Sequence, residues 1–358
     1  MSVQAVHQFV PTLERSAVGD HVLEAQRILR DLGLASEVFA ENVRPNLARR
    51  GRPYRDYGRA VKGRSDDVLL YHIAQGASLA DWVAARPETL VVDHHNITPA
   101  KFFSSWEPHI VPGLLWGRRQ IADLAGRAVL GLADSAYNES ELVEAGFKHT
   151  AVVPILLDLH DFERDVDEAA ANDLATSGNV WLFVGRVVPN KAQHDLVKAF
   201  AMYRRAYDPT AQLRIVGSSG SPSYGDALRE LIDAAGLDGA VTVTGGVSDG
   251  ELAAHYRTAS VYVCVSEHEG FNVPILEAWH HQIPVVGYAS TAVTETLGDG
   301  GLLLRSKDPA TVAAAVWRVV SDRRVHDALV AAGSRRLQSY DLPVTRQRFV
   351  DALRPLLG

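Results

Sequence analysis

Two glutamates separated by seven residues frame the segment of this chain best suited to bind an anionic ligand, Glu269-Gly270-Phe271-Asn272-Val273-Pro274-Ile275-Leu276-Glu277. The segment follows an apolar run of strand length and leads into a helical pattern. Gly270 and Asn272 tolerate unusual backbone angles, and Pro274 suits the first turn of a helix. The N–H groups at such a helix start bind anions without a metal ion. The two carboxylates, one before the turn and one within the helix, can hold hydroxyl groups at both ends of one ligand. The alternative is that Glu269 caps the helix and Glu277 is a solvated surface residue.

Two basic residues follow another apolar run. Phe183-Val184-Gly185-Arg186 ends a predicted strand over 180–185, and Lys191 comes five residues after Arg186. Ligands of open α/β sheets bind at the carboxyl ends of the strands. The arginine fork and the lysine point charge are suited to bind the oxygens of an anionic ligand. Two solvated basic residues in a loop are the alternative.

A third turn, Thr244-Gly245-Gly246-Val247-Ser248, also follows a predicted strand. On its own it reads equally well as an ordinary tight turn. The chain carries neither a GxGxxG fingerprint nor a Walker lysine, which argues against a dinucleotide or ATP site.

The elements that must position these residues alternate between strand and helix. The strands predicted in the first half cover 3–9, 67–71, 89–93 and 129–134, with helices over 21–34 and 138–145. Those predicted in the second half cover 180–185, 213–217, 241–245, 260–265 and 284–288, with a helix over 194–207. This alternation predicts an α/β protein with parallel sheets covered by helices on both faces.

The two glutamates, with Gly270 and Phe271 after the first, resemble the E-x7-E signature of the retaining GT-B glycosyltransferases (glycosyltransferase family 4, glycosyl transferases group 1). The resemblance implies two Rossmann-like, doubly wound domains with an interdomain cleft. It also implies that Glu269 contacts hydroxyls of a donor sugar and that Glu277 contacts the ribose. The backbone of four residues would meet sugar and phosphate: Gly270, Phe271, Asn272 and Val273.

The same resemblance implies roles for further residues. Gly185, Arg186 and Lys191 match the pattern that grips the donor diphosphate, and the backbone of Val247 would read the base. In the first half, His95 is similar to the histidine that contacts the donor sugar. The acceptor or phosphate side would include Gly19, Asp20 and Asn96. Gly19-Asp20 matches only in part, because Ala17-Val18 replaces the usual glycine pair.

Asp93, His94 and His95 also offer metal-ligand side chains in a row. Since side chains alternate along a strand, Asp93 and His95 share a face and His94 does not. We therefore expect no metal ion, and we expect no cofactor besides the nucleotide-sugar co-substrate.

The predicted domains are 1–160 on the acceptor side and 179–340 on the donor side. The linker between them, 161–178, is rich in aspartate and glutamate, as a hinge often is. A last helix over 341–358 follows Pro343 and is expected to close back on either domain, with the N-terminal domain as one candidate.

Composition limits the class of protein. The chain has 358 residues, enough for two domains, and 47% apolar with 22% charged residues indicates a globular protein. A net charge of −7 argues against nucleic acid as a partner.

The single cysteine, Cys264, lies in an apolar run and is expected to be a buried thiol. The N-terminus lacks the pattern of a signal peptide and no stretch is long enough to span a membrane, so we expect a cytoplasmic protein.

One charge cluster stands apart from this acidic balance. Between Arg44 and Arg64, eight basic residues are interrupted by a single acidic one, Asp56, with Tyr54 and Tyr57 interleaved. Such a segment is either a solvated loop, which we favour, or a peripheral contact with an anionic membrane surface.

The function that the resemblance implies is metal-independent, retaining transfer of a sugar from a UDP- or GDP-sugar. The acceptor would be a saccharide or lipid-linked hydroxyl in bacterial polysaccharide, glycolipid or glycoconjugate synthesis. Two alternatives stay open. One is a GT-B nucleotide-sugar epimerase or a phosphorylase, and the other is a non-catalytic nucleotide-sugar-binding protein.

Overall fold

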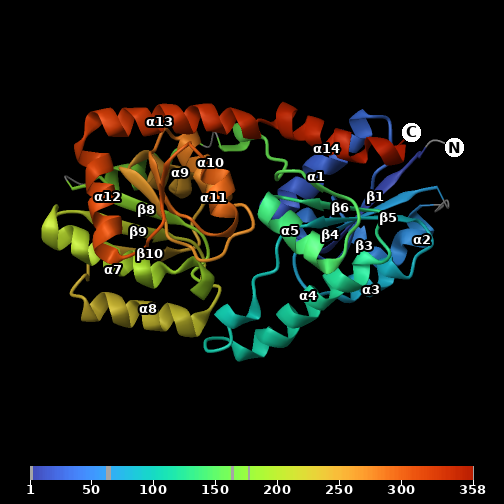
Figure 1. Ribbon diagram of the computed structural model, residues 1–358, viewed down its shortest axis with the longest axis horizontal. Helices are drawn as coiled ribbons and strands as arrows, with labels where there is room; N and C mark the ends of the chain where they lie inside the picture. Colours follow the sequence, from blue (N-terminus) through green and yellow to red (C-terminus); the bar gives the residue numbers. More distant parts are fainter. Residues whose placement is uncertain (1–2, 62–65, 163–164, 176–177, 358) are drawn as a thin grey trace. The chain divides into compact units, whose positions relative to one another are not determined.

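The computed structural model describes residues 3–61, 66–162, 165–175 and 178–357. The chain divides into two compact units (Figure 1). Unit 1 comprises Met1–Ala100, His109–Asp158 and Tyr340–Gly358, and unit 2 comprises Lys101–Pro108 and Leu159–Ser339. Each unit has its own parallel sheet and its own apolar core.

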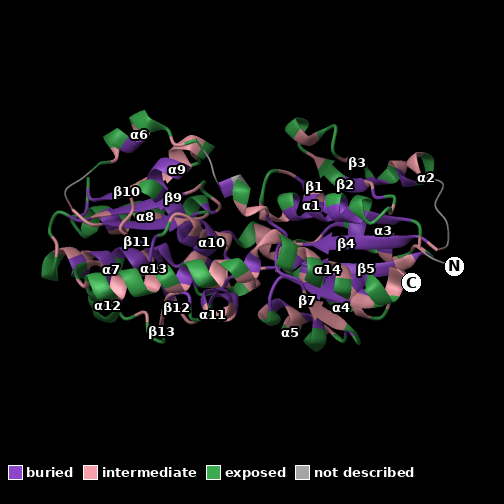
Figure 2. Ribbon diagram, turned by 90° about the horizontal axis from the view of Figure 1, so that it is seen from above, coloured by how far each residue is buried: buried purple, intermediate pink, exposed green. Residues whose placement is uncertain are grey.

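Unit 1 is built on a parallel sheet with the strand order β3-β2-β1-β4-β5-β6-β7. Its strands are β1 (Val6–Leu13), β2 (Val38–Val43), β3 (Arg52–Pro53), β4 (Val68–Ile73), β5 (Thr89–His94), β6 (Leu130–Ala133) and β7 (Thr150–Val152). Its α-helices are α1 (Ala17–Asp31), α2 (Tyr57–Ala60), α3 (Ser78–Ala84), α4 (Val111–Ala125), α5 (Ala136–Ala145) and α14 (Leu342–Leu357). Every residue of β4 is buried (Figure 2), because helices cover both faces of the sheet there.

The register of this sheet collects polar side chains in its interior. His72 of β4 pairs with Asp93 of β5, so the two side chains point to the same face. Gln8 of β1 pairs with Leu70, two residues before His72, and therefore lies on that face as well. His95 follows Asp93 by two residues, which brings a second histidine toward the same side.

Unit 2 is built on a parallel sheet with the strand order β10-β9-β8-β11-β12-β13. Its strands are β8 (Val180–Val184), β9 (Gln212–Val216), β10 (Val241–Gly245), β11 (Val261–Cys264), β12 (Val285–Tyr288) and β13 (Leu302–Leu304). Its α-helices are α6 (Glu168–Asp173), α7 (Gln193–Ala206), α8 (Pro222–Ala234), α9 (Asp249–Arg257), α10 (Val273–His280), α11 (Thr291–Leu297), α12 (Pro309–Ser321) and α13 (Arg323–Leu337). Trp181, Phe183 and Val263 lie at the centre of its core.

The strand order of unit 2 reverses at β8. The chain runs from β8 outward through β9 and β10, and then places β11 on the other side of β8. Connections at such a reversal leave in opposite directions and open a crevice at the carboxyl ends of the two strands, where ligands of open α/β sheets bind. The loops after β8 and β11 are therefore the best-placed ligand loops of this unit.

The structure differs from the predicted division in two places. Lys101–Pro108 groups with unit 2, and the predicted linker, 161–178, also belongs to unit 2 and contains the short helix α6. Asp167 explains that helix, because its side chain accepts a hydrogen bond from the N–H of Ala170 and caps the helix start. The last helix, α14, packs Phe349 and Leu353 into the core of unit 1.

Candidate functional site

The loop after β8 carries the predicted basic pair. Gly185 has a φ of +149°, a conformation that L side chains rarely adopt, and an added Cβ would stand 3.3 Å from the Lys191 side chain. This glycine therefore lets Lys191 pack against the end of β8. Arg186 is exposed, and its backbone carbonyl accepts a hydrogen bond from Gln193 Nε2 at 2.9 Å.

The loop after β11 turns sharply into α10. Asn272 precedes the helix with φ 84° and ψ 68°, in the left-handed region, and Pro274 lies in the first turn. The side chain of Asn272 is held by Cys264, the last residue of β11, because its amide donates to the Sγ of that cysteine at 3.2 Å. The N–H groups around this helix start are the predicted anion-binding groups.

An ion pair joins the two loops. Lys191 Nζ lies 2.7 Å and 2.9 Å from the two carboxylate oxygens of Glu269, and both side chains are mostly buried. Asn190 reinforces the junction, since its side-chain amide donates to the carbonyl of His268 at 3.0 Å and its own carbonyl accepts from the N–H of Glu267 at 2.8 Å. The structure thus brings together two charged residues that lie 78 positions apart.

Glu277 is not a solvated surface residue, and Glu269 does not cap α10. Glu277 is only 7% exposed, and one of its carboxylate oxygens accepts a hydrogen bond from the Tyr256 hydroxyl at 2.7 Å. The residue before α10 is Asn272, without a side-chain capping bond, while Glu269 is paired with Lys191. The alternative interpretation of the two glutamates is therefore wrong, because both are buried and held by specific partners.

The turn after β10 is tied to the same edge of the sheet. The N–H of Gly217 donates to the carbonyl of Gly245 at 3.0 Å, and the N–H of Gly185 donates to the carbonyl of Val216 at 2.8 Å. These bonds connect the ends of β8, β9 and β10 in sequence. Val247 follows this turn and is half-buried. Contact of its backbone with the base stays a prediction.

Thr291 fixes the back of the β11–α10 loop. Its hydroxyl accepts from the N–H of Glu269 at 2.8 Å and donates to the carbonyl of the same residue at 2.9 Å. The backbone of Thr291 has a φ of 35°, which is strained for a β-branched residue. Strain of this kind persists where the surrounding structure over-determines the backbone. The two hydrogen bonds of the Thr291 hydroxyl hold the backbone of Glu269 in place.

A hollow of about 590 Å³ lies beside Thr291. It is lined by Lys101, Phe102, Glu267, Tyr288, Ala289, Ser290 and Thr291. A second hollow, of about 510 Å³, includes Asn179, Ser260 and Pro284, which precede β8, β11 and β12. This second hollow therefore lies at the amino ends of the strands. We assign the site to the carboxyl ends, where the charged loops and the helix start converge.

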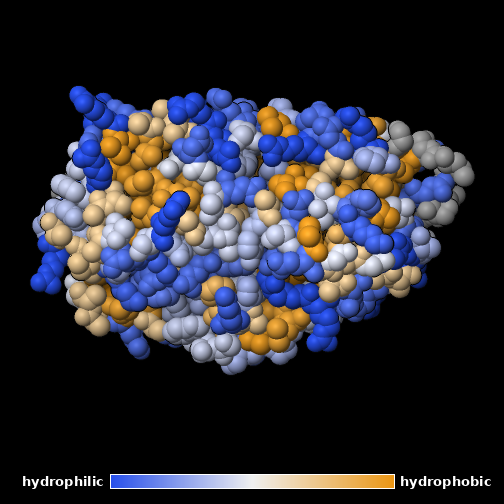
Figure 3. All heavy atoms as spheres, in the orientation of Figure 1, coloured by the Kyte–Doolittle hydropathy of each residue, from blue (hydrophilic) through white to orange (hydrophobic). Residues whose placement is uncertain are grey.

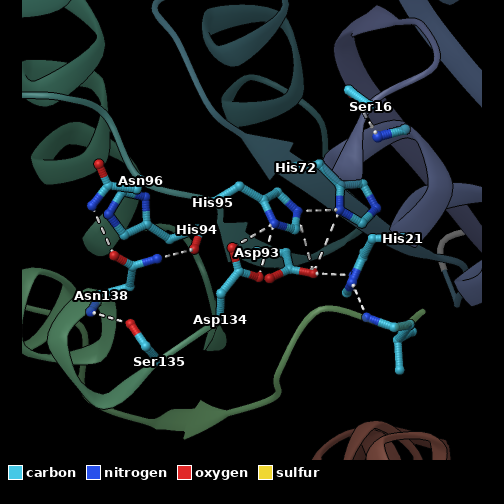
Figure 4. A network of polar contacts seen from close by, with 12 residues as sticks. Ser16, His21, His72, Asp93, His94, His95, Asn96, Asp134, Ser135 and Asn138 are labelled. Atoms are coloured by element: carbon cyan, nitrogen blue, oxygen red, sulfur yellow. Dashed lines mark hydrogen bonds and ion pairs between the residues drawn. The ribbon is translucent and has the colours of Figure 1, made fainter. Parts of the chain in front are cut away.

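His95, predicted to contact the donor, belongs to unit 1 and has a fully buried side chain. Its Nδ1 lies 3.0 Å from Asp134, and its Nε2 lies 3.0 Å from Nδ1 of His72 (Figure 4). Burial lowers the pKa of His95, but the carboxylates of Asp134 and Asp93 more than offset this and raise the pKa to about 9. Both ring nitrogens are thus engaged inside unit 1, and the donor contact stays a prediction.

His94 points elsewhere, as the alternation along a strand predicts. Its Nε2 lies 2.9 Å from one carboxylate oxygen of Glu141, and Arg118 contacts the other oxygen at 2.8 Å. Burial raises the pKa of Glu141, but these two partners outweigh burial and lower the pKa to about 2. Asp93, His94 and His95 therefore do not converge on one point.

Two of the predicted acceptor-side residues, Gly19 and Asn96, have structural roles. Asn96 has a φ of 72°, and its amide donates to Oδ1 of Asn138 at 2.8 Å. Gly19 lies in the first turn of α1, where an added Cβ would stand 1.8 Å from the carbonyl oxygen of Glu14. The close approach of these backbones requires the glycine, while the neighbouring Asp20 is exposed. Contact with acceptor or phosphate stays a prediction for Gly19, Asp20 and Asn96.

The basic segment from Arg44 presents its arginines and buries its tyrosines. Arg49, Arg50 and Arg55 are exposed, whereas Tyr54 and Tyr57 pack into the core of unit 1. The two tyrosine side chains thus attach the segment to the core of unit 1 and do not belong to its exposed surface. Lys62 and Arg64 lie outside the described residues.

Hydrophilic side chains cover much of the face seen in Figure 3, with apolar ones between them. Within the described part of the chain, no helix has the length and apolar character needed to cross a bilayer.

Comparisons with known proteins agree with this geometry. Residues 166–336, most of unit 2, match the family model described as glycosyl transferases group 1. A D-inositol 3-phosphate glycosyltransferase from Kineococcus radiotolerans is 31% identical over 260 residues, which cover 68% of this chain and 60% of that relative. The chain thus spans less than two thirds of the length of this curated relative.

Solved structures share the fold across both units. Sucrose-phosphate synthase from Thermosynechococcus elongatus superposes with a TM-score of 0.75 at 19% identity, covering 98% of this chain and 99% of the other. HepE from Anabaena, solved in complex with UDP-glucose, gives a TM-score of 0.72 at 18% identity, covering 98% and 99%.

Two Rossmann-like units with parallel sheets and these structural neighbours define an α/β protein of the GT-B class. The family-model match over unit 2 identifies the family within this class. The chain belongs to the glycosyl transferases of group 1.

Proposed function

We propose that this protein is a retaining glycosyltransferase that transfers a sugar from a UDP- or GDP-sugar to an acceptor hydroxyl. The observation that carries the proposal is the Lys191–Glu269 pair at the reversal between β8 and β11, directly before the start of α10. A cation, a carboxylate and the start of a helix meet there within one unit. A donor with an anionic diphosphate and a sugar rich in hydroxyls needs that combination.

Each group has a defined task in this proposal. The bond between the anomeric carbon and the diphosphate oxygen breaks, and the negative charge that develops on the diphosphate is stabilised by Arg186, Lys191 and the N–H groups at the start of α10. Glu269 binds sugar hydroxyls, and Glu277, oriented by Tyr256, binds the ribose. The acceptor oxygen bonds to the anomeric carbon on the face that the diphosphate leaves, and its proton passes to the departing phosphate.

Similar proteins support the choice of donor and acceptor. One relative is named for glycosyl transfer to D-inositol 3-phosphate, and one structural neighbour binds UDP-glucose. We propose a saccharide or lipid-linked acceptor, in the synthesis of bacterial polysaccharide, glycolipid or glycoconjugate.

A panel of UDP-, GDP- and ADP-sugars tests the function. The true donor should raise the melting temperature, because a ligand that binds only the folded state stabilises it. With an acceptor saccharide, the product should keep the anomeric configuration of the donor, as measured by NMR. An inverted product contradicts retention. Epimerised donor, a sugar phosphate formed with inorganic phosphate, or binding without turnover would favour the epimerase, phosphorylase or binding-protein alternative.

We expect the transfer step to need no metal ion at the donor site, because Arg186 and Lys191 supply the positive charge. Turnover measured after brief incubation with EDTA should equal turnover without it, and added Mg²⁺ or Mn²⁺ should not raise it. If EDTA abolishes turnover and Mg²⁺ restores it within the same assay, the two basic residues do not replace a metal.

Contact of the exposed arginines with anionic membranes is the alternative to the solvated loop that we favour, and vesicle sedimentation tests that contact. Reversing Arg49, Arg50, Arg52 and Arg55 to Glu should abolish sedimentation with phosphatidylglycerol vesicles at low salt. Hydrolysis of the donor should be unchanged in this variant, since the segment lies in unit 1 and the donor loops lie in unit 2. A wild-type protein that does not sediment with the vesicles returns the segment to the solvated-loop interpretation.

A further inference from the structure

A second group of polar side chains lies inside unit 1, apart from the donor loops. It comprises His21 of α1, His72 of β4, Asp93 of β5 and His95 (Figure 4). One ligand-type atom from each residue lies within 4.8 Å of the others, and all four side chains are fully buried. Four titratable groups buried at one point need a shared source of charge balance.

Three of these atoms have the spacing of ligands around one metal ion. Nδ1 of His72 lies 3.0 Å from Nε2 of His95 and 3.5 Å from Oδ2 of Asp93, and Nε2 of His95 lies 3.7 Å from the same oxygen. In a tetrahedral zinc site with bonds of about 2.0 Å, neighbouring ligand atoms are about 3.3 Å apart. The triangle therefore fits a first-row transition metal without moving its corners far.

The outer contacts orient both imidazoles toward this triangle. The carboxylate of Asp134 accepts from Nδ1 of His95 at 3.0 Å, and the amide oxygen of Gln8 accepts from Nε2 of His72 at 2.9 Å. Both outer nitrogens thus carry protons, and without a further proton on His95 the two inner nitrogens present lone pairs. Metal-binding histidines are held in this way. Two lone pairs that face each other at 3.0 Å repel unless a positive charge lies between them, either a metal ion or a shared proton.

His21 plays a different part from the other two histidines. Its Nδ1 accepts from the N–H of Leu156 at 3.0 Å, so the proton of the neutral ring is on Nε2, which donates to Oδ2 of Asp93 at 3.0 Å. His21 therefore orients the carboxylate and is not a ligand. The other oxygen of Asp93, Oδ1, is buried without a hydrogen-bond partner among the described residues.

We propose that His72, Asp93 and His95 bind one divalent transition-metal ion, zinc by preference. Two imidazoles and a carboxylate suit zinc, whereas magnesium and calcium prefer oxygen ligands alone. The two charges of the ion balance the buried carboxylates of Asp93 and Asp134. The ion links β4 to β5 and, through Asp134, to the end of β6, and it stabilises unit 1 by binding the folded state.

The metal content of the full-length protein, freed of any histidine tag, tests this site. After loading with ZnCl2 and dialysis, the wild type should hold about one equivalent of zinc per chain. His72→Gln and His95→Gln should each hold less than about a tenth of an equivalent under the same conditions. His94→Gln is the matched control, because His94 is buried on the same strand but faces Glu141, and it should retain the metal. Circular dichroism confirms that each variant is folded.

X-ray absorption at the zinc edge provides a test that needs no variant. The wild type should show two imidazole ligands and oxygen ligands without sulfur. Zinc should also raise the melting temperature of the wild type and of His94→Gln, but not that of His72→Gln. A zinc-loaded wild type that holds less than about a tenth of an equivalent overturns the proposal in favour of a shared proton. Loss of metal from His94→Gln alone, or a different ligand set at the edge, also overturns it.

Discussion

Replacing Arg186 with Ala is expected to lower turnover by roughly two to three orders of magnitude, the usual effect of removing one group that stabilises developing charge. Lys191→Ala should lower turnover by a similar factor. The two variants should differ in stability. Arg186 is exposed, so its loss should leave the melting temperature unchanged, whereas Lys191→Ala leaves the mostly buried carboxylate of Glu269 without its cation and should lower the melting temperature.

Steady-state kinetics and thermal unfolding of the same preparations check both expectations. Lys198→Ala is the matched control, because Lys198 is a half-exposed lysine of α7 that pairs with Asp195 and lies outside the donor loops. It should keep full turnover. An increase in KM with kcat unchanged for Arg186→Ala would contradict a role in stabilising the leaving group, since only uniform binding would then have been lost.

The second large effect concerns the two glutamates, whose roles should separate. Glu277 is assigned to the ribose, which does not change during the reaction. Glu277→Gln should therefore weaken the nucleoside diphosphate and the intact donor by similar factors. Tyr256→Phe should produce a smaller loss of the same kind, because it removes the hydroxyl that orients the carboxylate at 2.7 Å.

Glu269→Gln should behave differently. Its assigned contact is the sugar, so affinity for the free nucleoside diphosphate should stay almost intact. The variant also releases Lys191 from its carboxylate, which leaves that cation free for phosphate. Turnover should fall more than donor affinity, as expected when an interaction strengthens in the transition state.

Calorimetry with the diphosphate and kinetics with the donor distinguish the two glutamates. If Glu269→Gln loses the diphosphate while Glu277→Gln keeps it, the two assignments are reversed.

The strand–helix alternation was enough to predict the fold class and the strands that lead into the site. The predicted strand over 241–245 agrees with β10 at both ends, and the strand before Arg186 is one residue longer than β8. Local patterns succeed there because buried parallel strands are apolar on both faces. They failed at β2, whose second half, Glu41 and Asn42, is exposed and polar.

The partners within each site could not be predicted in this way. Lys191 and Glu269 are 78 residues apart, and His21 and Asp93 are 72 apart. Such pairs depend on which strands are neighbours and in which register, and hydrophobic periodicity does not report either. The alternation along β5 did separate His94 from its neighbours, but only the sheet register reveals that His72 completes the group.

The buried position of Cys264 makes its rate of alkylation a measure of how often the surrounding structure opens. The thiol is the only one in the chain, lies fully buried beneath the turn, and contacts Ser266 and the amide of Asn272. Burial, reinforced by the charge of Glu269, raises its pKa, so alkylating reagents meet a protonated sulfur that they cannot reach. Labelling therefore requires the structure around the thiol, which includes Asn272, to open, and the labelling rate measures how often it does so. A bound nucleotide that holds the turn closed would be seen as slower labelling, without any need to follow the reaction itself.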